Sequence, residues 1–483
     1  MLNDVSLRTK ALRYVKWVSF SRILPKLFAP ITTVLMVKIF TPTDYGIVGI
    51  CGAFISFLNL LQGFGIDDYI IRLKEETELK LYTTYWTNFS ISMILFLFLT
   101  LSSPFIAHIY SEKSLLYFLP ALSINLLLNS IGFVPWAILR KRMEFKKLFF
   151  INFAPLLITL SLTIPLGYLK FGPWALVIGQ ISLTFLTNVY YLIQSHWKFK
   201  FMFDKGELKE ILNFGKFVSF ERIQEYFYAN IDVFLIGYFL DMKSLGIYGL
   251  AKSWSWLIFG IVTSPMTDIL YPAFQKFNGD LNRIRDNFLE VEKRMFFITF
   301  PIFLIISLNA INIIHLIFPA RWGETAIVLS IIVIGDGIAK SFSLQRDIFK
   351  LIGKPDIYPK AFLINFFFTI LCYPIAAKFG LITFAITRVI NDLLYTFIQY
   401  YLSKREFAFT NKDFFSRLKP IIFSGLLMVI GNLLFLKLLP VNFLIVALTL
   451  IVTTATYIIS FSLFDRESFK KIYQEGKIIL GFK

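Results

Sequence analysis

Charged residues are scarce in this 483-residue chain, and histidine and cysteine are scarcer still. Asp, Glu, Lys and Arg together make up 17% of the residues, and the chain has three histidines and two cysteines. Cys51 and Cys372 both fall within apolar stretches, so a disulfide framework is not expected. His108, His196 and His315 are far apart and none belongs to an HExxH pattern, so we predict no metal site.

Patterns that hold nucleotides are also missing. The sequence has no GxxxxGK[ST] phosphate loop and no DxD pair, and Gly63-Phe64-Gly65 lacks the third glycine of a dinucleotide fingerprint. The segments between apolar stretches are too short for a soluble catalytic domain. The longest, 196–210 and 275–294, can be solvated surface or amphipathic helices at the membrane interface. The sequence therefore predicts neither an enzyme nor a bound cofactor.

Long runs without charge are the main feature that is present. The chain is 57% hydrophobic, with a mean hydropathy of +0.67. No Asp, Glu, Lys or Arg occurs in 82–110, 148–169 or 295–320, for example. About 20 apolar residues cross the hydrocarbon core as a helix, whereas a membrane barrel shows alternating segments of about ten residues. We therefore expect an all-α integral membrane protein.

Turn residues and charges divide the chain into fourteen predicted transmembrane helices. They are Tyr14–Phe40, Tyr45–Tyr69, Tyr82–Tyr110, Leu115–Leu139, Leu148–Leu169, Pro173–Ile193, Ile211–Leu240, Leu245–Phe274, Met295–Phe318, Thr325–Phe349, Tyr358–Ala377, Leu381–Leu402, Leu418–Leu436 and Val441–Phe464. Lys and Arg gather at both termini and in every second loop, which places both termini in the cytoplasm. This topology, rather than nucleic-acid binding, explains the net charge of +18.

The sequence contains an internal repeat. Val18-Ser19-Phe20-Ser21-Arg22-Ile23 recurs 200 residues later as Val218-Ser219-Phe220-Glu221-Arg222-Ile223. Gly46-Ile47-Val48-Gly49 recurs at the same offset as Gly246-Ile247-Tyr248-Gly249, and Lys170-Phe171-Gly172 is echoed by Lys378-Phe379-Gly380. Such matches at corresponding places of two helix sets indicate a duplicated unit.

The repeat predicts two parallel six-helix lobes around a central cavity, with two further helices appended. Residues 1–200 would form the N-terminal lobe, 201–405 the C-terminal lobe, and 406–483 helices 13 and 14 with a cytoplasmic tail. Both lobes begin at the cytoplasm, so the axis that relates them runs along the membrane normal.

Ionisable residues inside predicted membrane helices identify candidate sites, because each costs roughly 2.5 to 3.5 kcal/mol to insert. Arg22 and Lys26 lie four residues apart with no acidic residue within four positions, whereas Arg222 has Glu221 and Glu225 nearby. Buried cations of this kind suit an anionic ligand such as a phosphate. The charge-free helices 3, 4, 5, 6, 9 and 14 are expected to form the lipid-facing wall.

Two further sets of charged residues can be explained by pairing within one helix. Asp336 with Lys340 and Arg388 with Asp392 each have the spacing of a pair on one helical turn, so they can neutralise each other.

Three segments together resemble a known family. They are Thr41-Pro42-Thr43-Asp44-Tyr45-Gly46 before the second helix, Gly63-Phe64-Gly65-Ile66 near its end, and Leu139-Arg140-Lys141-Arg142-Met143-Glu144-Phe145 after the fourth. With the helix count and the repeat, they resemble bacterial polysaccharide flippases. These form the Wzx-type branch of the multidrug/oligosaccharidyl-lipid/polysaccharide exporter superfamily.

The resemblance implies a function in cell-surface polysaccharide synthesis, such as that of O-antigen. An undecaprenyl-diphosphate-linked oligosaccharide would cross the bacterial plasma membrane by alternating access around a cationic cavity. The implied partners are that lipid-linked oligosaccharide and membrane lipids, with other polysaccharide-assembly membrane proteins as further candidates. Arg22, Lys26, Arg222 and Lys252 are the candidate substrate-binding residues.

Two alternatives stay open at this stage. A cation-coupled drug exporter of the same superfamily would use Asp232, Asp336 or Asp392 as its coupling carboxylate, with Lys340 and Arg388 as ion-pair partners. A membrane polysaccharide polymerase or ligase would need a large external loop with catalytic residues.

Overall fold

A computed structural model describes most of the chain. The described residues are 24, 26, 28–63, 65, 66, 69, 70, 73, 77–142, 144–263, 274, 281–342, 348, 349, 351–354, 357–438 and 443–479. The chain divides into two compact units, 1–249 and 250–483. The predicted division at residues 200 and 405 follows the repeat rather than this packing, and it stays a prediction.

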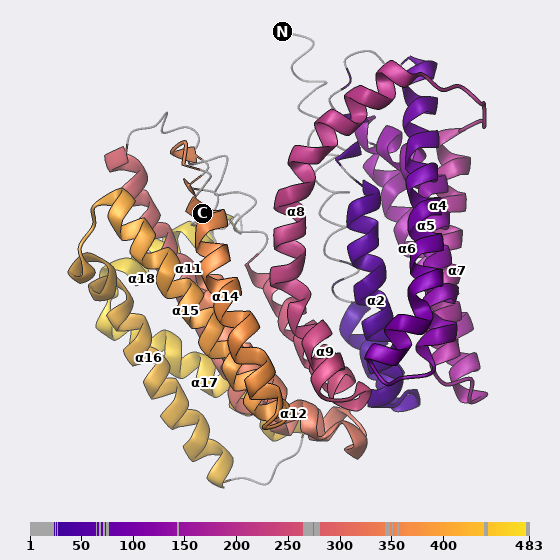
Figure 1. Cartoon of the computed structure of the whole chain (residues 1–483). Coiled ribbons are helices and arrows are strands. Elements are labelled where there is room, and N and C mark those ends of the chain that lie inside the picture. Colours follow the sequence, from indigo (N-terminus) through magenta and orange to yellow (C-terminus); the bar gives the residue numbers. More distant parts are fainter. Residues whose placement is uncertain are drawn as a thin grey trace. The chain divides into compact units, whose positions relative to one another are not determined.

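The first unit is a bundle of long helices (Figure 1). A short apolar helix, Phe28–Ile39, comes first. It is followed by α2 (Pro42–Gly63), α4 (Glu78–Ile109), α5 (Leu115–Lys141), α6 (Phe145–Tyr168), α7 (Pro173–Ser195), α8 (Lys205–Phe239) and the first turns of α9 (Met242–Val262). Capping side chains fix several of these starts: Thr77 accepts from the Lys80 N–H, and Asp204 accepts from the Glu207 N–H at 2.9 Å.

The second unit continues α9 and adds α11 (Leu281–Ile317), the short 3₁₀ helix η1 (Ala320–Trp322), α12 (Glu324–Ser341), α14 (Ile357–Ala377), α15 (Leu381–Phe407), α16 (Asn411–Leu438), α17 (Phe443–Phe464) and α18 (Arg466–Ile479). Its core is rich in phenylalanine and tyrosine: Phe288, Phe296 and Phe349 are buried together with Tyr457 and Phe461.

The prediction of an all-α membrane protein is confirmed. Every regular element in the described ranges is a helix, and twelve of these helices are long and apolar enough to span a membrane. Phe28–Ile39 and α8 correspond to predicted helices 1 and 7. The first is described over only part of its predicted length, and α8 is interrupted by charges, so the count of fourteen stays a prediction.

The two sets of six helices have the same packing order. In the first set α4 packs on α5, α5 on α7, and α6 on α7. In the second set α11 packs on α12, α12 on α15, and α14 on α15. Gly172 and Gly380 precede α7 and α15 with φ of 55° and 98°, a backbone region that favours glycine, so both copies of the Lys-Phe-Gly motif end on a left-handed glycine.

The repeated glycines Gly46 and Gly246 meet each other. A Cβ on Gly46 would lie 1.7 Å from the Met242 carbonyl oxygen, and a Cβ on Gly246 would lie 1.7 Å from the Pro42 carbonyl oxygen. All four residues belong to the first unit. Only glycine on both sides lets the first turns of α2 and α9 approach this closely.

One expectation is wrong. The charge-free helix α5 is mostly covered by other helices and not by lipid. In its most apolar stretch of 18 residues 61% of the residues are buried, against 22% in the corresponding stretches of α4 and α7. The absence of charge does not distinguish contact with lipid from contact with other helices. For the segment 196–210 both alternatives had stayed open: residues 197–204 form no helix, α8 begins at Lys205, and the Lys198 and Lys200 carbonyls accept hydrogen bonds from Tyr82 and Trp86 of α4.

Candidate functional site

A cavity of about 390 Å³ lies inside the first unit, between α2, α5 and α7. We call it the amide cavity because three asparagines and one glutamine line it: Asn59, Gln62, Asn129 and Asn188. Among the described residues that line it, none is Asp, Glu, Lys, Arg or His. A largely apolar cavity that also presents several amides is suited to a ligand with an apolar face and hydroxyl or amide groups at its edges.

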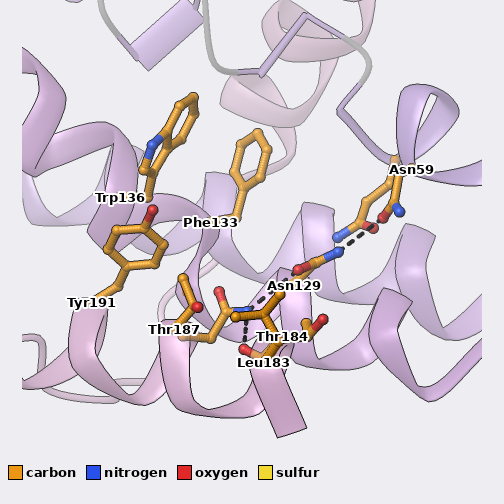
Figure 2. Close-up of a pocket in the computed structure, with 11 residues that line it drawn as sticks. Asn59, Asn129, Phe133, Trp136, Leu183, Thr184, Thr187 and Tyr191 are labelled. Atoms are coloured by element: carbon orange, nitrogen blue, oxygen red, sulfur yellow. Dashed lines mark hydrogen bonds between the residues drawn. The ribbon is translucent and has the colours of Figure 1, made fainter. Parts of the chain in front are cut away.

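The asparagines form a chain of hydrogen bonds across the three helices (Figure 2). The Asn129 side-chain amide donates to Asn59 Oδ1 at 3.1 Å, and the Asn188 amide donates to Asn129 Oδ1 at 3.3 Å. Asn188 also donates to the Thr184 carbonyl at 2.8 Å. These bonds fix the orientation of the amides while leaving further donor and acceptor capacity for a ligand.

Helical spacing and one glycine place these side chains. Residues 129, 132, 133 and 136 of α5, and 184, 187, 188 and 191 of α7, each follow the i, i+3, i+4, i+7 pattern that lines one face of a helix. A Cβ on Gly132 would lie 1.9 Å from Asn188 Oδ1. Glycine at this position therefore makes room for the Asn188 side chain.

Aromatic side chains close one end of the amide cavity. Figure 2 shows Trp136 and Tyr191 at this end, with Phe133 beside them and Asn59 at the opposite end. The Tyr191 hydroxyl donates to Asn152 Oδ1 at 3.0 Å, which holds its ring in place. Flat aromatic faces beside amides can contact the apolar face of a ligand whose edges are polar.

The second unit holds a cluster of buried charges. Arg388 Nη2 lies 3.1 Å from Asp336 Oδ1, and Lys340 Nζ lies 3.0 Å from Asp336 Oδ2. Arg388 Nη2 is also 3.6 Å from Asp392 Oδ2, and the Ser255 hydroxyl donates to Asp336. The structure thus brings together four of the predicted residues, two cations with two carboxylates, so that the cluster has no net formal charge.

Lys340 has a second set of contacts. Its ammonium lies 4.4 Å from the centre of the Trp256 ring and 5.0 Å from that of Phe259. Cation–π contacts of this kind partly replace the hydration that the buried ammonium has lost. The functional role predicted for this cluster stays a prediction.

The predicted cationic residues lie on three different helices. Arg22 lies outside the described residues, as does the first copy of the Val-Ser-Phe repeat. Lys26 in the first helix and Arg222 on α8 are half-buried, and Lys252 on α9 is buried in the second unit. Asp232 on α8 is buried and accepts a hydrogen bond from the Tyr248 hydroxyl.

The two sites occupy corresponding helices of the repeat. The amide cavity lies on α2, α5 and α7, and the charge cluster on α9, α12 and α15. In both, a glycine brings the last two helices together: Gly132 beside Asn188, and Gly335 beside Val389. The first unit has the amide cavity on these helices, and the second unit has the paired charges.

The amide cavity was not predicted from the sequence, because only ionisable residues within the membrane helices were taken as candidate site residues. The usable signal was the set of amides at helical spacing within predicted membrane helices 2, 4 and 6. Asn59 with Gln62 and Asn129 with Gly132 lie three residues apart, and Thr184 with Asn188 four. Polar side chains at membrane depth mark a site whether or not they carry charge.

Comparisons with known proteins agree with this architecture. The Bacillus subtilis (strain 168) teichuronic acid biosynthesis protein TuaB is 28% identical over 336 residues, which are 66% of each chain. The Escherichia coli (strain K12) lipopolysaccharide biosynthesis protein WzxC is 23% identical over 412 residues, which are 82% of each chain.

Solved structures share the fold. The lipid II flippase MurJ in an inward closed conformation has a TM-score of 0.74 at 16% identity, covering 94% of this chain and 99% of that one. An inward-facing multidrug resistance transporter of the MATE family has a TM-score of 0.60 at 15% identity, covering 82% of this chain and 98% of that one. The profile of the family described as "Polysaccharide biosynthesis protein" matches residues 35–327, more than half of the chain. This all-α membrane protein therefore belongs to the polysaccharide biosynthesis protein family.

Proposed function

We infer that this protein is a flippase, a transporter rather than an enzyme, which moves a lipid-linked oligosaccharide across a bacterial plasma membrane. The carrier proposed for the sugar is undecaprenyl diphosphate, and the direction is from the cytoplasmic to the outer face. Both termini lie in the cytoplasm in this proposal, as the distribution of Lys and Arg in the sequence indicates.

The amide cavity is the observation that carries the proposal. A membrane-spanning bundle has no structural need for a cavity of about 390 Å³ lined by four carboxamides and three aromatic rings. Sugars present hydroxyls that both donate and accept hydrogen bonds, together with an apolar ring face. Carboxamides match the hydroxyls and aromatic rings match the face.

The names of related proteins support a polysaccharide precursor as the substrate. TuaB and WzxC are named for teichuronic acid and lipopolysaccharide biosynthesis, and a further relative, ExoT of Rhizobium meliloti, for succinoglycan biosynthesis transport. MurJ, which shares the fold, is named a lipid II flippase. The fold also occurs in drug exporters of the MATE family, but the uncharged amide cavity favours a glycan over a cationic drug.

The charged residues have separate roles in this proposal. Arg22, Lys26, Arg222 and Lys252 would contact the diphosphate, because guanidinium and ammonium groups bind phosphate oxygens. Asp232 and the cluster of Asp336, Lys340, Arg388 and Asp392 would hold helices in register or change pairing during transport. The domains 1–200 and 201–405 would be the two moving lobes, with 406–483 appended.

Reconstitution tests the proposal. Purified protein in vesicles is supplied with fluorescent lipid-linked oligosaccharide extracted from the producing bacterium, and a membrane-impermeant probe reports its arrival at the opposite leaflet. We expect transfer that depends on the protein. Absence of transfer, together with export of cationic dyes driven by an ion gradient, would contradict the proposal and favour the drug exporter.

A further inference from the structure

A second cavity, of about 360 Å³, lies next to the amide cavity in the first unit. We call it the threonine cavity because Thr159 and Thr163 of α6 line it, together with Gln180 of α7. The side chain of Leu183 lines both cavities. The two cavities are therefore neighbours, and Leu183 lies at the boundary between them.

Together the cavities follow the helices through most of the membrane. Along α7 the lining begins at Leu176 in the threonine cavity and ends at Tyr191 in the amide cavity. At about 1.5 Å per residue this corresponds to about 22 Å. The hydrocarbon core is about 30 Å thick, so the two cavities together extend along a large part of it.

Unpaired polar groups in both cavities indicate that a ligand supplies their partners. The hydroxyls of Thr159 and Thr163 and the side-chain carbonyl of Gln62 have no hydrogen-bond partner among the described residues. These three residues are 7%, 3% and 2% exposed. A buried polar group without a partner costs about 1–3 kcal/mol, which a bound hydroxyl or amide would recover.

The lining also defines the charge of the ligand. Of the described residues that line either cavity, none is Asp, Glu, Lys, Arg or His. A carboxylate or phosphate placed here would lose its hydration without gaining an opposite charge. Hydroxyls and N-acetyl groups match this described lining, which offers an anionic group no opposite charge.

We propose that the amide and threonine cavities are two consecutive subsites for uncharged sugar residues of the transported glycan, with Leu183 between them. This inference rests on the proposed flippase function and adds to it the charge class and the minimum length of the glycan. The volume of each cavity equals that of about twelve water molecules, since one water takes up about 30 Å³. This volume accommodates a sugar ring. A glycan of at least two uncharged sugars fills both subsites.

Cavity-filling variants test the inference. Gly52 lines the threonine cavity, and a Cβ there would meet no atom within 4 Å, so Gly52→Phe fills space without a clash at its first carbon. Thr187 lines the amide cavity, so Thr187→Phe adds a ring there (Figure 2). Gly431→Phe on α16 is the matched control, because a Cβ there has only ordinary contacts, at 3.9 Å from Thr456, and lines neither cavity.

Transport is measured in vesicles with two substrates from the producing bacterium: the complete lipid-linked oligosaccharide and the precursor that carries only the first sugar. Gly52→Phe and Thr187→Phe should each reduce transport of the complete substrate at least tenfold. The one-sugar precursor should be sensitive to only one of these two variants and stay within twofold of wild type with the other. Gly431→Phe should leave both substrates unaffected.

The outcomes separate the inference from the proposed function and from misfolding. No transport of either substrate by the wild-type protein contradicts the proposed function itself. Transport of the complete substrate at wild-type rate by either filling variant overturns the two subsites, as does equal loss of both substrates with both variants. Membrane abundance and the unfolding temperature of each variant identify one that fails to fold; Gly52→Leu and Thr187→Leu, which are smaller, then replace it with the same expected pattern.

Discussion

The contact between Gly46 and Gly246 gives a sharp prediction about how α2 and α9 separate. Alanine at either position places a Cβ 1.7 Å from a backbone carbonyl oxygen of the other helix, where ordinary contact begins at 3.4 Å. The helices must therefore move apart by about 1.7 Å at this point, because backbone atoms on both sides cannot rotate away. Overpacking of this kind costs about 1–3 kcal/mol.

This cost applies only to the conformation in which the two helix starts touch. In the proposed orientation these starts face the outside, so we expect their separation to open the space between the two helices to the outside. A penalty of about 1–3 kcal/mol shifts a two-state equilibrium by roughly 5- to 150-fold. Gly46→Ala and Gly246→Ala should each raise the population in which these two helix starts are apart by a factor in this range.

Cysteine labelling measures the shift. Ile247, which is fully buried beside Gly246, is replaced by cysteine in a protein whose own Cys51 and Cys372 are changed to serine. The rate of reaction with a membrane-impermeant maleimide added from outside then reports opening. We expect at least a fivefold faster reaction with Gly46→Ala.

The same repeat supplies the control. Gly49 and Gly249 end the two copies of the motif, and a Cβ at either would meet no atom within 4 Å. Gly49→Ala and Gly249→Ala should leave the labelling rate unchanged. Equal rates for Gly46→Ala and Gly49→Ala would refute the reasoning that close backbone approach holds the two helices together.

Three further predictions concern the cavity, the charge cluster and the tail. Gly132→Ala should displace Asn188, whose Oδ1 would lie 1.9 Å from the new Cβ, and should lower transport at normal membrane abundance. The control is Gly63→Ala, where the new Cβ meets no atom within 4 Å, and equal transport by the two variants would contradict this prediction. Asp336→Asn leaves two buried cations without their shared carboxylate, so the protein should lose about 3–5 kcal/mol of stability in a denaturant titration, and an unchanged midpoint would show that the cluster is not stabilising. Burial opposes ionisation of Asp465, but hydrogen bonds from the Lys293 ammonium and the Ser468 N–H lower its pKa below the ordinary 3.8. The ionised Asp465 stabilises the start of α18 above about pH 3.8, and this contribution is lost as the pH falls through the pKa of the folded protein. After correction for the intrinsic rate, hydrogen exchange of α18 should therefore be constant from pH 8 to 5 and rise only below pH 4. A rise between pH 7 and 5 would point to another group.

Hydropathy and turn residues were sufficient to predict the all-α membrane fold. Runs such as 82–110 and 295–320 have no alternative to a membrane helix, and α4 and α11 cover them. The repeat that contains Gly46 and Gly246 could be recognised in the sequence. The contact between these two glycines could not be predicted, because the sequence does not show which helices touch. Burial of α5 was missed for the same reason.

The candidate site was only partly predictable. Asp336 with Lys340 and Arg388 with Asp392 were identified as pairs within a helix, whereas the 3.1 Å contact between Arg388 and Asp336 joins two helices. The amide cavity depends on Gly132 admitting Asn188 between α5 and α7, which requires the crossing geometry of both helices. Uncharged polar residues also occur in membrane helices for packing alone, so composition cannot separate the two roles.

Photo-crosslinking tests the central claim that the first unit binds the glycan. The probe is a lipid-linked oligosaccharide with a diazirine on an uncharged sugar, bound to the full-length protein in vesicles and activated by light. We predict that mass spectrometry finds the label on the faces of α5 and α7 that line the amide cavity, at or beside Asn129, Trp136 and Tyr191, with less label on Thr187→Phe. Label confined to the second unit, or equal label on the first unit of wild-type and Thr187→Phe proteins, would contradict the account.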